Sequence, residues 1–270
     1  TPTGEMMAAW YSLGIFYPFF RGHSHITSIR REPWLWEDKV RDSIINSIIL
    51  RYHLLMYFYT KYYEHVKSGI PILKPLWMIL RNNFEELINI KHQGTLFIFG
   101  DELIGYNNYT IIEDEILILN NKIDVPIYDL ISGEKINKKW KKNQEKMIQP
   151  YILGGSIIPW TEKIENCSNY VVSAPITLKV FVDENKCAKG NYYLDDGISV
   201  NINDGYIYME FELCKGRLRI NNLNPWGILN IAPVIEKIEI FGYGKINKVN
   251  IKENILSVNY DEEYDVNHID

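Results

Sequence analysis

EDKVRDSIINSIILRYHLLMYFYTKYYEHV, residues 37–66, is the stretch that constrains the fold most strongly. Its apolar and aromatic side chains recur at intervals of three and four residues, which predicts one long helix. Ser68 and Gly69 end the pattern, and Pro71 prevents its continuation. Aromatic side chains occupy most sides of this helix, so other structure must surround it. We therefore expect this region to be one part of a larger domain.

Length and composition describe an ordinary folded protein. The chain has 270 residues, enough for one large domain or two modest ones, with 46% apolar and 23% charged residues. Its net charge of −5 provides no basic surface for nucleic acid. The longest apolar run, residues 43–63, is interrupted by Arg51, His53 and Lys61, which favours a buried helix over a membrane span. The 3 cysteines lack metal-binding spacing and can form at most one disulfide.

From about residue 70 the pattern changes to short strands separated by turn residues. YIYMEFEL (206–213) and IEKIEIFG (235–242) alternate apolar and polar side chains, which suits sheets with one solvated face. Gly154 and Gly155 precede SIIPW and indicate a close approach of the backbone. These changes divide the chain near residues 78 and 165. The predicted strands cover residues 72–79, 95–98, 115–119, 125–130, 176–182, 190–194, 206–213, 217–220, 235–241, 249–251 and 255–258.

Two histidines follow an aromatic run in YPFFRGHSH, residues 17–25. His23 and His25 have no acidic or cysteine ligand at matching spacing, which argues against a zinc site. Aromatic walls with a few directed polar groups are typical of sugar sites, because ring faces cover the apolar faces of a pyranose. Judged from these residues alone, two histidines with hydrogen bonds inside the fold are the simpler interpretation.

Three further motifs have modest interpretations. RREPW (30–34) predicts a loop held by Arg–Glu hydrogen bonds ahead of a proline. YLDDG (193–197) predicts a β-turn, since the other ligands of a calcium loop are missing. Asn108 in NNYT and Asn166 in NCS stand in glycosylation sequons.

Several ordered stretches of the chain resemble glycoside hydrolase family 31. They are WYSLGIFYPFFRGHSHITSIRREPWLW (10–36), LRYHLLMYFYTKYYEHVKSGIPILKPLW (50–77), GGSIIP (154–159), APITLKVFVD (174–183) and GNYYLDDG (190–197). Arg21 and His23 match the Arg-x-His core of the whole family, whereas His25 and RREPW resemble its glucosidase II branch. Beyond Gly205, only the strand pattern and IEKIEIFGYG support the resemblance.

The resemblance implies an α+β multidomain fold. Residues 1–78 would form the C-terminal end of a (β/α)8 barrel, followed by two antiparallel β-sandwich domains at 79–165 (proximal) and 166–270 (distal). His23 would lie at the mouth of the barrel and bind a glucose hydroxyl in the −1 subsite, with Arg21 supporting it. No catalytic residue is expected in this chain, because the family's Trp-x-Asp-Met-like nucleophile segment and Gly-Asp-Asn-like acid/base segment are absent. Asp101 falls in the predicted sandwich region and is not a candidate.

The resemblance also implies an activity. The parent enzyme would be a retaining α-glucosidase that removes α-1,3-linked glucose from N-glycan precursors in the endoplasmic-reticulum lumen, without cofactor or metal. Its partners would be an α-glucoside or glucosylated N-glycan and a β-subunit of the glucosidase II type, with neither nucleic acid nor membrane. This chain alone would be inactive. Two alternatives stay open: a family 31 α-glucosidase acting on maltose-like substrates, and a non-catalytic carbohydrate-binding or scaffold module.

Overall fold

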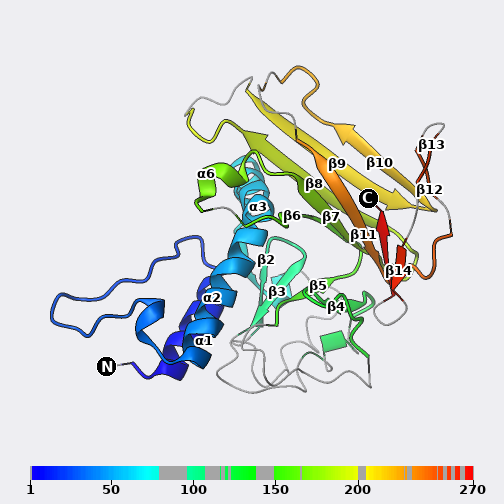
Figure 1. Cartoon of the computed structure of the whole chain (residues 1–270). Coiled ribbons are helices and arrows are strands. Elements are labelled where there is room, and N and C mark those ends of the chain that lie inside the picture. Colours follow the sequence, from blue (N-terminus) through cyan, green and yellow to red (C-terminus); the bar gives the residue numbers. More distant parts are fainter. Residues whose placement is uncertain are drawn as a thin grey trace.

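The computed structural model shows helices at the N-terminal end and two β-sheets beyond them (Figure 1). A third, two-stranded sheet pairs β12 (Val249–Ile251) with β13 (Asn254–Leu256). The structure describes residues 2–78, 96–106, 116, 119–120, 123–137, 149–164, 166–199, 205–227, 229, 233–247, 249–251, 254–256, 259–261 and 265–269.

The first two helices pack side by side and run parallel, with Gly4 near Val40 at one end and Ile15 bonded to Arg51 at the other. Helix α1 (Gly4–Gly14) begins at Thr3, whose hydroxyl accepts from the Met6 N–H at 3.2 Å and so caps the helix. Its buried face meets α2 (Asp38–His53), and a short 3₁₀ helix, η1 (Pro33–Leu35), precedes α2. The side chains between α1 and α2 form a small separate core of Met7, Ala8, Val40 and Ile44.

The predicted helix over residues 37–66 is present but is interrupted once. Leu54, which is fully buried, separates α2 from α3 (Leu55–Ser68). Its N–H still donates to the Leu50 carbonyl at 3.2 Å, and its own carbonyl accepts from Phe58 at 2.9 Å, so the helical path continues through it. The predicted end is confirmed: Gly69 adopts the left-handed conformation with φ 71°, which glycine takes without strain.

Five short strands form an antiparallel sheet next to α3. The strands lie in the order β1-β2-β3-β5-β4, and Ile98 stands opposite Ile104 at its centre. The predicted strand at 115–119 is wrong, because residues 116, 119 and 120 are helical. Ile116 and Leu119 are buried three residues apart, which is the spacing of one helix face. Residues 116–119 are all apolar, so their sequence does not distinguish a helix from a strand. The strands are β1 (Leu73–Pro75), β2 (Leu96–Phe99), β3 (Leu103–Tyr106), β4 (Ile127–Asp129) and β5 (Tyr151–Leu153).

Eight strands form the larger sheet, in the order β10-β9-β8-β6-β7-β11-β15-β14. Its strands are not all antiparallel as predicted, because β11 runs parallel to β7 and β6 runs parallel to β8. The chain leaves β7, builds the β8–β10 part of the sheet, and returns on the other side of β7, which makes that pair parallel. The strands are β6 (Ser156–Trp160), β7 (Ile176–Phe181), β8 (Ala188–Asp195), β9 (Tyr206–Cys214), β10 (Arg217–Asn222), β11 (Ile235–Phe241), β14 (Asn259–Asp261) and β15 (Val266–Ile269).

The chain passes from the smaller sheet to the larger one at the predicted glycine pair. Gly155 has φ 84°, and a Cβ on Gly154 would lie 2.5 Å from the Pro126 ring and 2.7 Å from the Val182 carbonyl oxygen. The close backbone approach predicted there is therefore confirmed. The strands change sheet at this pair, before residue 165, and β1 joins the smaller sheet before residue 78. Domain divisions near 78 and 165 stay predictions.

Helix α3 is hydrogen-bonded to both sheets. Tyr57 donates to the Phe99 carbonyl at 2.9 Å and to the Glu102 carboxylate at 2.8 Å, next to the smaller sheet. Toward the larger sheet, Tyr59 donates to Asp195 at 2.6 Å. These bonds hold the N-terminal helices, and the loop between α1 and η1, in a defined place relative to the sheets. Among the described residues, no helix is long and apolar enough to cross a membrane.

Candidate functional site

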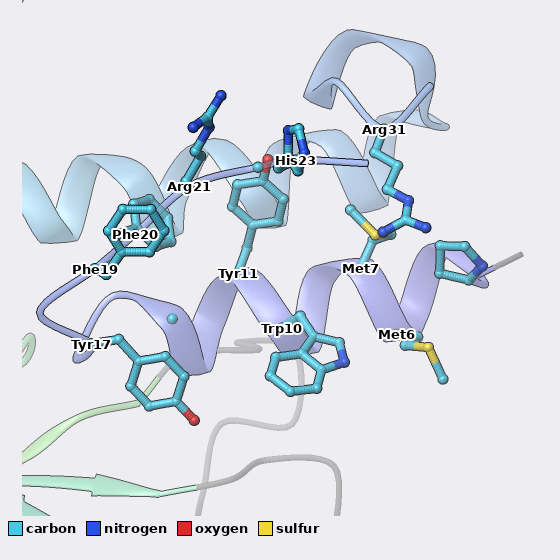
Figure 2. Close-up of a pocket in the computed structure, with 13 residues that line it drawn as sticks. Met6, Met7, Trp10, Tyr11, Tyr17, Phe19, Phe20, Arg21, His23 and Arg31 are labelled. Atoms are coloured by element: carbon cyan, nitrogen blue, oxygen red, sulfur yellow. The ribbon is translucent and has the colours of Figure 1, made fainter. Parts of the chain in front are cut away.

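A cavity of about 570 Å³ lies along α1 and the loop that follows it (Figure 2). Its walls are mostly aromatic and thioether side chains, and Figure 2 shows Arg21, His23 and Arg31 among them on the loop side. This is the composition expected of a site that covers apolar ring faces and directs a few polar groups at a ligand. The lining includes Tyr11, Tyr17, Phe20, Arg21, His23 and Arg31.

His23 is exposed and lines this cavity. Within the described part of the chain, no side chain or carbonyl is hydrogen-bonded to its imidazole, so both ring nitrogens are free to meet a ligand. The interpretation of His23 as a histidine satisfied inside the fold is therefore wrong. Its sugar-binding role stays a prediction.

Gly22 and Tyr11 bring the His23 loop against α1. A Cβ at Gly22 would overlap the Tyr11 hydroxyl oxygen, so the absence of a side chain lets the loop pack directly on that hydroxyl. Tyr11 also meets Phe20 edge-to-face, with ring centroids 5.7 Å apart. Burial, assisted by the charge of Glu32, raises the pKa of Tyr11 above its ordinary value, which keeps the phenol protonated.

Arg51 fastens the start of the same loop to α2. Its guanidinium donates to the carbonyl of Ile15 at 2.5 Å and to that of Tyr17 at 2.9 Å, and it lies 5.0 Å from the centroid of the Phe20 ring. In the sequence, Arg51 stands out only as an interruption of an apolar run. A lone arginine on a buried helix face was the available signal, because such a cation needs partners.

Arg21 and His25 lie on either side of His23 in the chain but differ in position. Arg21 is exposed and lines the cavity, and no bond joins it to His23 in the described structure. Its supporting role stays a prediction. His25 lies outside the cavity lining, where its Nδ1 is 2.9 Å from the Thr27 hydroxyl.

The loop interpretation of RREPW is confirmed. Arg30 donates from Nε and Nη2 to one Glu32 oxygen at 2.9 and 2.7 Å, and Pro33 then begins η1. These bonds stiffen the loop from within. Arg31, between the two, lines the cavity, and its carbonyl accepts from Trp36 Nε1 at 3.3 Å.

The remaining acidic motifs have structural partners. Asp101 is paired with Lys74 on β1 and lies outside the cavity lining, so it stays excluded as a catalytic candidate. The β-turn predicted for YLDDG is only partly present: Tyr193–Asp195 form the end of β8, and the chain bends after them, where the Asp196 carboxylate accepts from the Ile198 and Ser199 N–H groups at 3.0 and 2.8 Å. The hydrogen bond from the Ser199 hydroxyl, together with these two backbone bonds, lowers the pKa of Asp196 to about 2. The described residues contain no cluster of three metal-binding side chains.

One disulfide is formed, in agreement with the limit of one pair. Cys187 is bonded to Cys214, and Cys167 is exposed and unpaired. The sequon asparagine Asn166 is exposed beside Cys167. The other sequon, Asn108, lies outside the described residues.

Comparison with known proteins agrees with the resemblance to family 31. A family model, "Glycosyl hydrolases family 31 TIM-barrel domain", matches residues 1–61. The "Probable glucan 1,3-alpha-glucosidase" of Oryza sativa subsp. japonica is 30% identical over 93% of this chain and 28% of its own length. "Neutral alpha-glucosidase AB" of Dictyostelium discoideum is 28% identical over 96% of this chain and 28% of its own length. The chain thus spans less than a third of these relatives.

The solved structures share this fold. The glucosidase II alpha subunit with Glc1Man2 bound superposes with a TM-score of 0.83 at 22% identity, over 100% of this chain and 32% of that one. The catalytic subunit in an ER glucosidase II complex with the binding domain of its regulatory subunit superposes with a TM-score of 0.77 at 22% identity, over 100% of this chain and 31% of that one. At this identity the likeness establishes the fold: the tail of a barrel followed by β-sheet regions.

Proposed function

Because this chain belongs to glycoside hydrolase family 31 and is homologous to the C-terminal part of glucosidase II α-subunits, we propose that its parent protein is a retaining α-glucosidase. The parent removes α-1,3-linked glucose from N-glycan precursors. The observation that carries the proposal is His23, exposed and without a partner among the described residues, on the wall of an aromatic cavity. That cavity lies within the residues that match the family's barrel.

The chemistry needs two carboxylates that this chain does not supply. A retaining glycosidase attacks the anomeric carbon with one carboxylate, while a second protonates the leaving oxygen and then activates water. The family's two aspartate segments are absent from the 270 residues. We therefore expect the 270-residue chain alone to show no turnover.

His23 contributes by binding a glucose hydroxyl in the −1 subsite. Its imidazole has one donor and one acceptor nitrogen when neutral, so it can pair with a hydroxyl in either direction. Tyr11 below the loop and Arg51 at its start hold the loop in place, so little conformational freedom is lost when the sugar binds. Arg21 supports this loop from the same cavity wall. The role of the aromatic side chains is to cover the apolar face of the sugar.

The two sheets behind the barrel are proposed to belong to a proximal and a distal β-sandwich domain. Location in the endoplasmic-reticulum lumen and assembly with a β-subunit are proposed on the same homology. They are supported by a relative whose structure is described as an ER glucosidase II heterodimer with a regulatory subunit.

Linkage preference of the parent protein tests the proposal. The specificity constants kcat/KM for α-1,3-, α-1,4- and α-1,6-linked glucose disaccharides are compared under one set of conditions. A preference for the α-1,3 linkage supports the proposal. A preference for maltose supports the alternative hypothesis, a family 31 α-glucosidase that acts on maltose-like substrates. Oligosaccharide binding without hydrolysis of any disaccharide would establish the non-catalytic module instead.

A further inference from the structure

The segment between β6 and β7 carries an asparagine with the sequence and exposure of a modification site. Asn166, Cys167 and Ser168 form an Asn-x-Ser sequon, and all three are exposed. The Tyr170 N–H bonds to the Cys167 carbonyl at 3.3 Å, so the sequon stands at the start of a surface turn and its asparagine side chain is free of the core.

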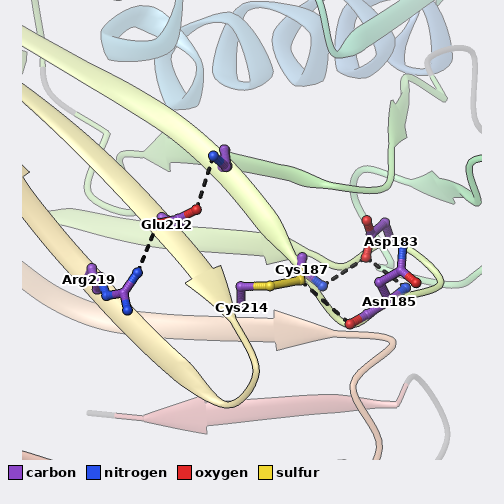
Figure 3. Close-up of a disulfide and its surroundings, with 7 residues drawn as sticks. Asp183, Asn185, Cys187, Glu212, Cys214 and Arg219 are labelled. Carbon is purple, nitrogen blue, oxygen red and sulfur yellow. Dashed lines mark hydrogen bonds and ion pairs between the residues drawn. A yellow bond between two sulfur atoms is a disulfide. The ribbon is translucent and has the colours of Figure 1, made fainter.

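A disulfide elsewhere in the chain points to a compartment where such a modification occurs. Strands β8 and β9 pair antiparallel. Cys187 directly precedes β8, Cys214 is the last residue of β9, and the two are joined by the disulfide (Figure 3). Asp183 holds this end of the sheet by accepting from the Cys187 N–H at 2.8 Å. Disulfides persist in secretory compartments and are rare in the cytosol. N-linked glycans are added to sequons of secretory proteins.

We propose that Asn166 carries an N-linked glycan, an inference that rests on the proposed luminal location. In the transfer, Asn166 Nδ2 forms a bond to C1 of the reducing-end sugar of a lipid-pyrophosphate-linked oligosaccharide. The bond between C1 and the pyrophosphate oxygen breaks, the lipid pyrophosphate leaves, and the amide loses one proton. The reaction involves no change of oxidation state.

Exposed apolar side chains and a free thiol lie beside Asn166 in the sequence. Ile164, two residues before it, is 40% exposed, and Tyr170, four residues after it, is 57% exposed. Cys167, directly beside it, is an exposed thiol without a disulfide partner, which in an oxidising compartment can pair with another molecule. A glycan at Asn166 covers the apolar side chains and shields the thiol from intermolecular disulfide exchange.

Peptide mapping of the parent protein from its natural source tests the modification. Trypsin cleavage after Lys163 and Lys179 releases a peptide, residues 164–179, in which Asn166 is the single sequon, so Asn108 cannot contribute to the signal. Enzymatic deglycosylation in heavy-oxygen water converts a glycosylated Asn166 to a mass-labelled aspartate. The labelled peptide is the expected result, and an unlabelled Asn166 overturns the proposal.

Matched variants of the parent, expressed in eukaryotic cells, test the shielding. Ser168→Thr keeps the sequon and should keep the glycan, whereas Ser168→Ala and Asn166→Gln remove it and should increase disulfide-linked dimer on non-reducing gels at least several-fold. Adding Cys167→Ala to Ser168→Ala should abolish the dimer. Equal dimer levels in Ser168→Thr and Ser168→Ala would overturn the shielding role. Active α-glucosidase with an intact disulfide but unmodified Asn166 would refute this inference and leave the proposed function standing.

Discussion

Arg51 donates from its guanidinium to the carbonyl of Tyr17 across 2.9 Å, and this bond joins α2 to the loop that carries His23. The same group bonds the Ile15 carbonyl, so the last turn of α1 and the first residues of the loop share one cation. Burial lowers the pKa of Arg51 from its ordinary value, but an arginine stays protonated in proteins. The position of His23 therefore depends on a residue that does not touch the cavity.

Replacing Arg51 should impair stability and activity together. Arg51→Ala in the parent protein leaves two partly buried carbonyls unpaired, which should cost about 1–3 kcal/mol of unfolding free energy. It should also lower kcat/KM for an α-glucoside. Arg41→Ala on the same helix is the control, because the Arg41 guanidinium is paired, among the described residues, only with the exposed Asp38 and Asp42 carboxylates. Equal effects of the two variants in denaturant unfolding would contradict the role of Arg51.

Removal of the His23 imidazole should affect catalysis and leave folding intact. His23→Ala should lower kcat/KM of the parent by about 1.5–3 kcal/mol of transition-state stabilisation, as expected when a sugar hydroxyl loses its partner. The thermal midpoint should change little, because the side chain is exposed. His25→Ala serves as the comparison, since in the described structure the His25 imidazole bonds only to its neighbour Thr27. A His23→Ala enzyme with unchanged kcat/KM would rule out the assigned contact.

A methyl group at position 22 should displace the His23 loop. Gly22→Ala places a Cβ on the Tyr11 hydroxyl oxygen, and overpacking of this kind costs about 1–3 kcal/mol. Because the collision involves the hydroxyl oxygen, the double variant Gly22→Ala, Tyr11→Phe should recover most of the lost stability and activity. A double-mutant cycle on unfolding free energy and kcat/KM measures this coupling. Purely additive effects would show that Tyr11 does not support the loop.

His53 should make stability depend on pH. Burial, with a contribution from the charge of Lys179, lowers the pKa of His53 below its usual 6.5, although the Thr161 carbonyl and Glu162 act in the opposite direction. The folded state thus favours the neutral imidazole, which stacks on the Trp160 ring with the two ring centroids 4.5 Å apart. Below about pH 6.5 the unfolded chain binds a proton that the folded chain resists. This contribution to stability is therefore present above that pH and is lost as the pH falls through the lowered pKa.

Thermal midpoints between pH 5 and pH 8 measure this effect. His53→Gln should be less stable than the parent at pH 8, because it loses the stacked ring, and its midpoint should fall less steeply on acidification. The exposed His25→Gln should leave the pH profile unchanged. Parallel profiles for the parent and His53→Gln would exclude His53 as a source of the pH dependence.

Local signals in the sequence were enough to predict the helix over residues 37–66, its end at Gly69 and most strands of the larger sheet. Each depends on side-chain periodicity or on a residue with special backbone freedom, and both act within a few residues. The strand predicted at 115–119 failed because a short apolar run satisfies both periods.

The tertiary structure alone decided the parallel pairing of β7 with β11, the place where the chain changes sheet, and the Arg51 contacts. These features join residues distant in the chain: Arg51 meets carbonyls more than 30 positions away, and Tyr59 meets Asp195 across 136. A linear pattern shows that a buried cation or a strand needs a partner, but the partner is chosen by packing of the whole chain. The sequence by itself therefore determined the local elements and the family, whereas only the fold brought the His23 loop and Tyr11 together at one cavity and placed Arg51 behind that loop.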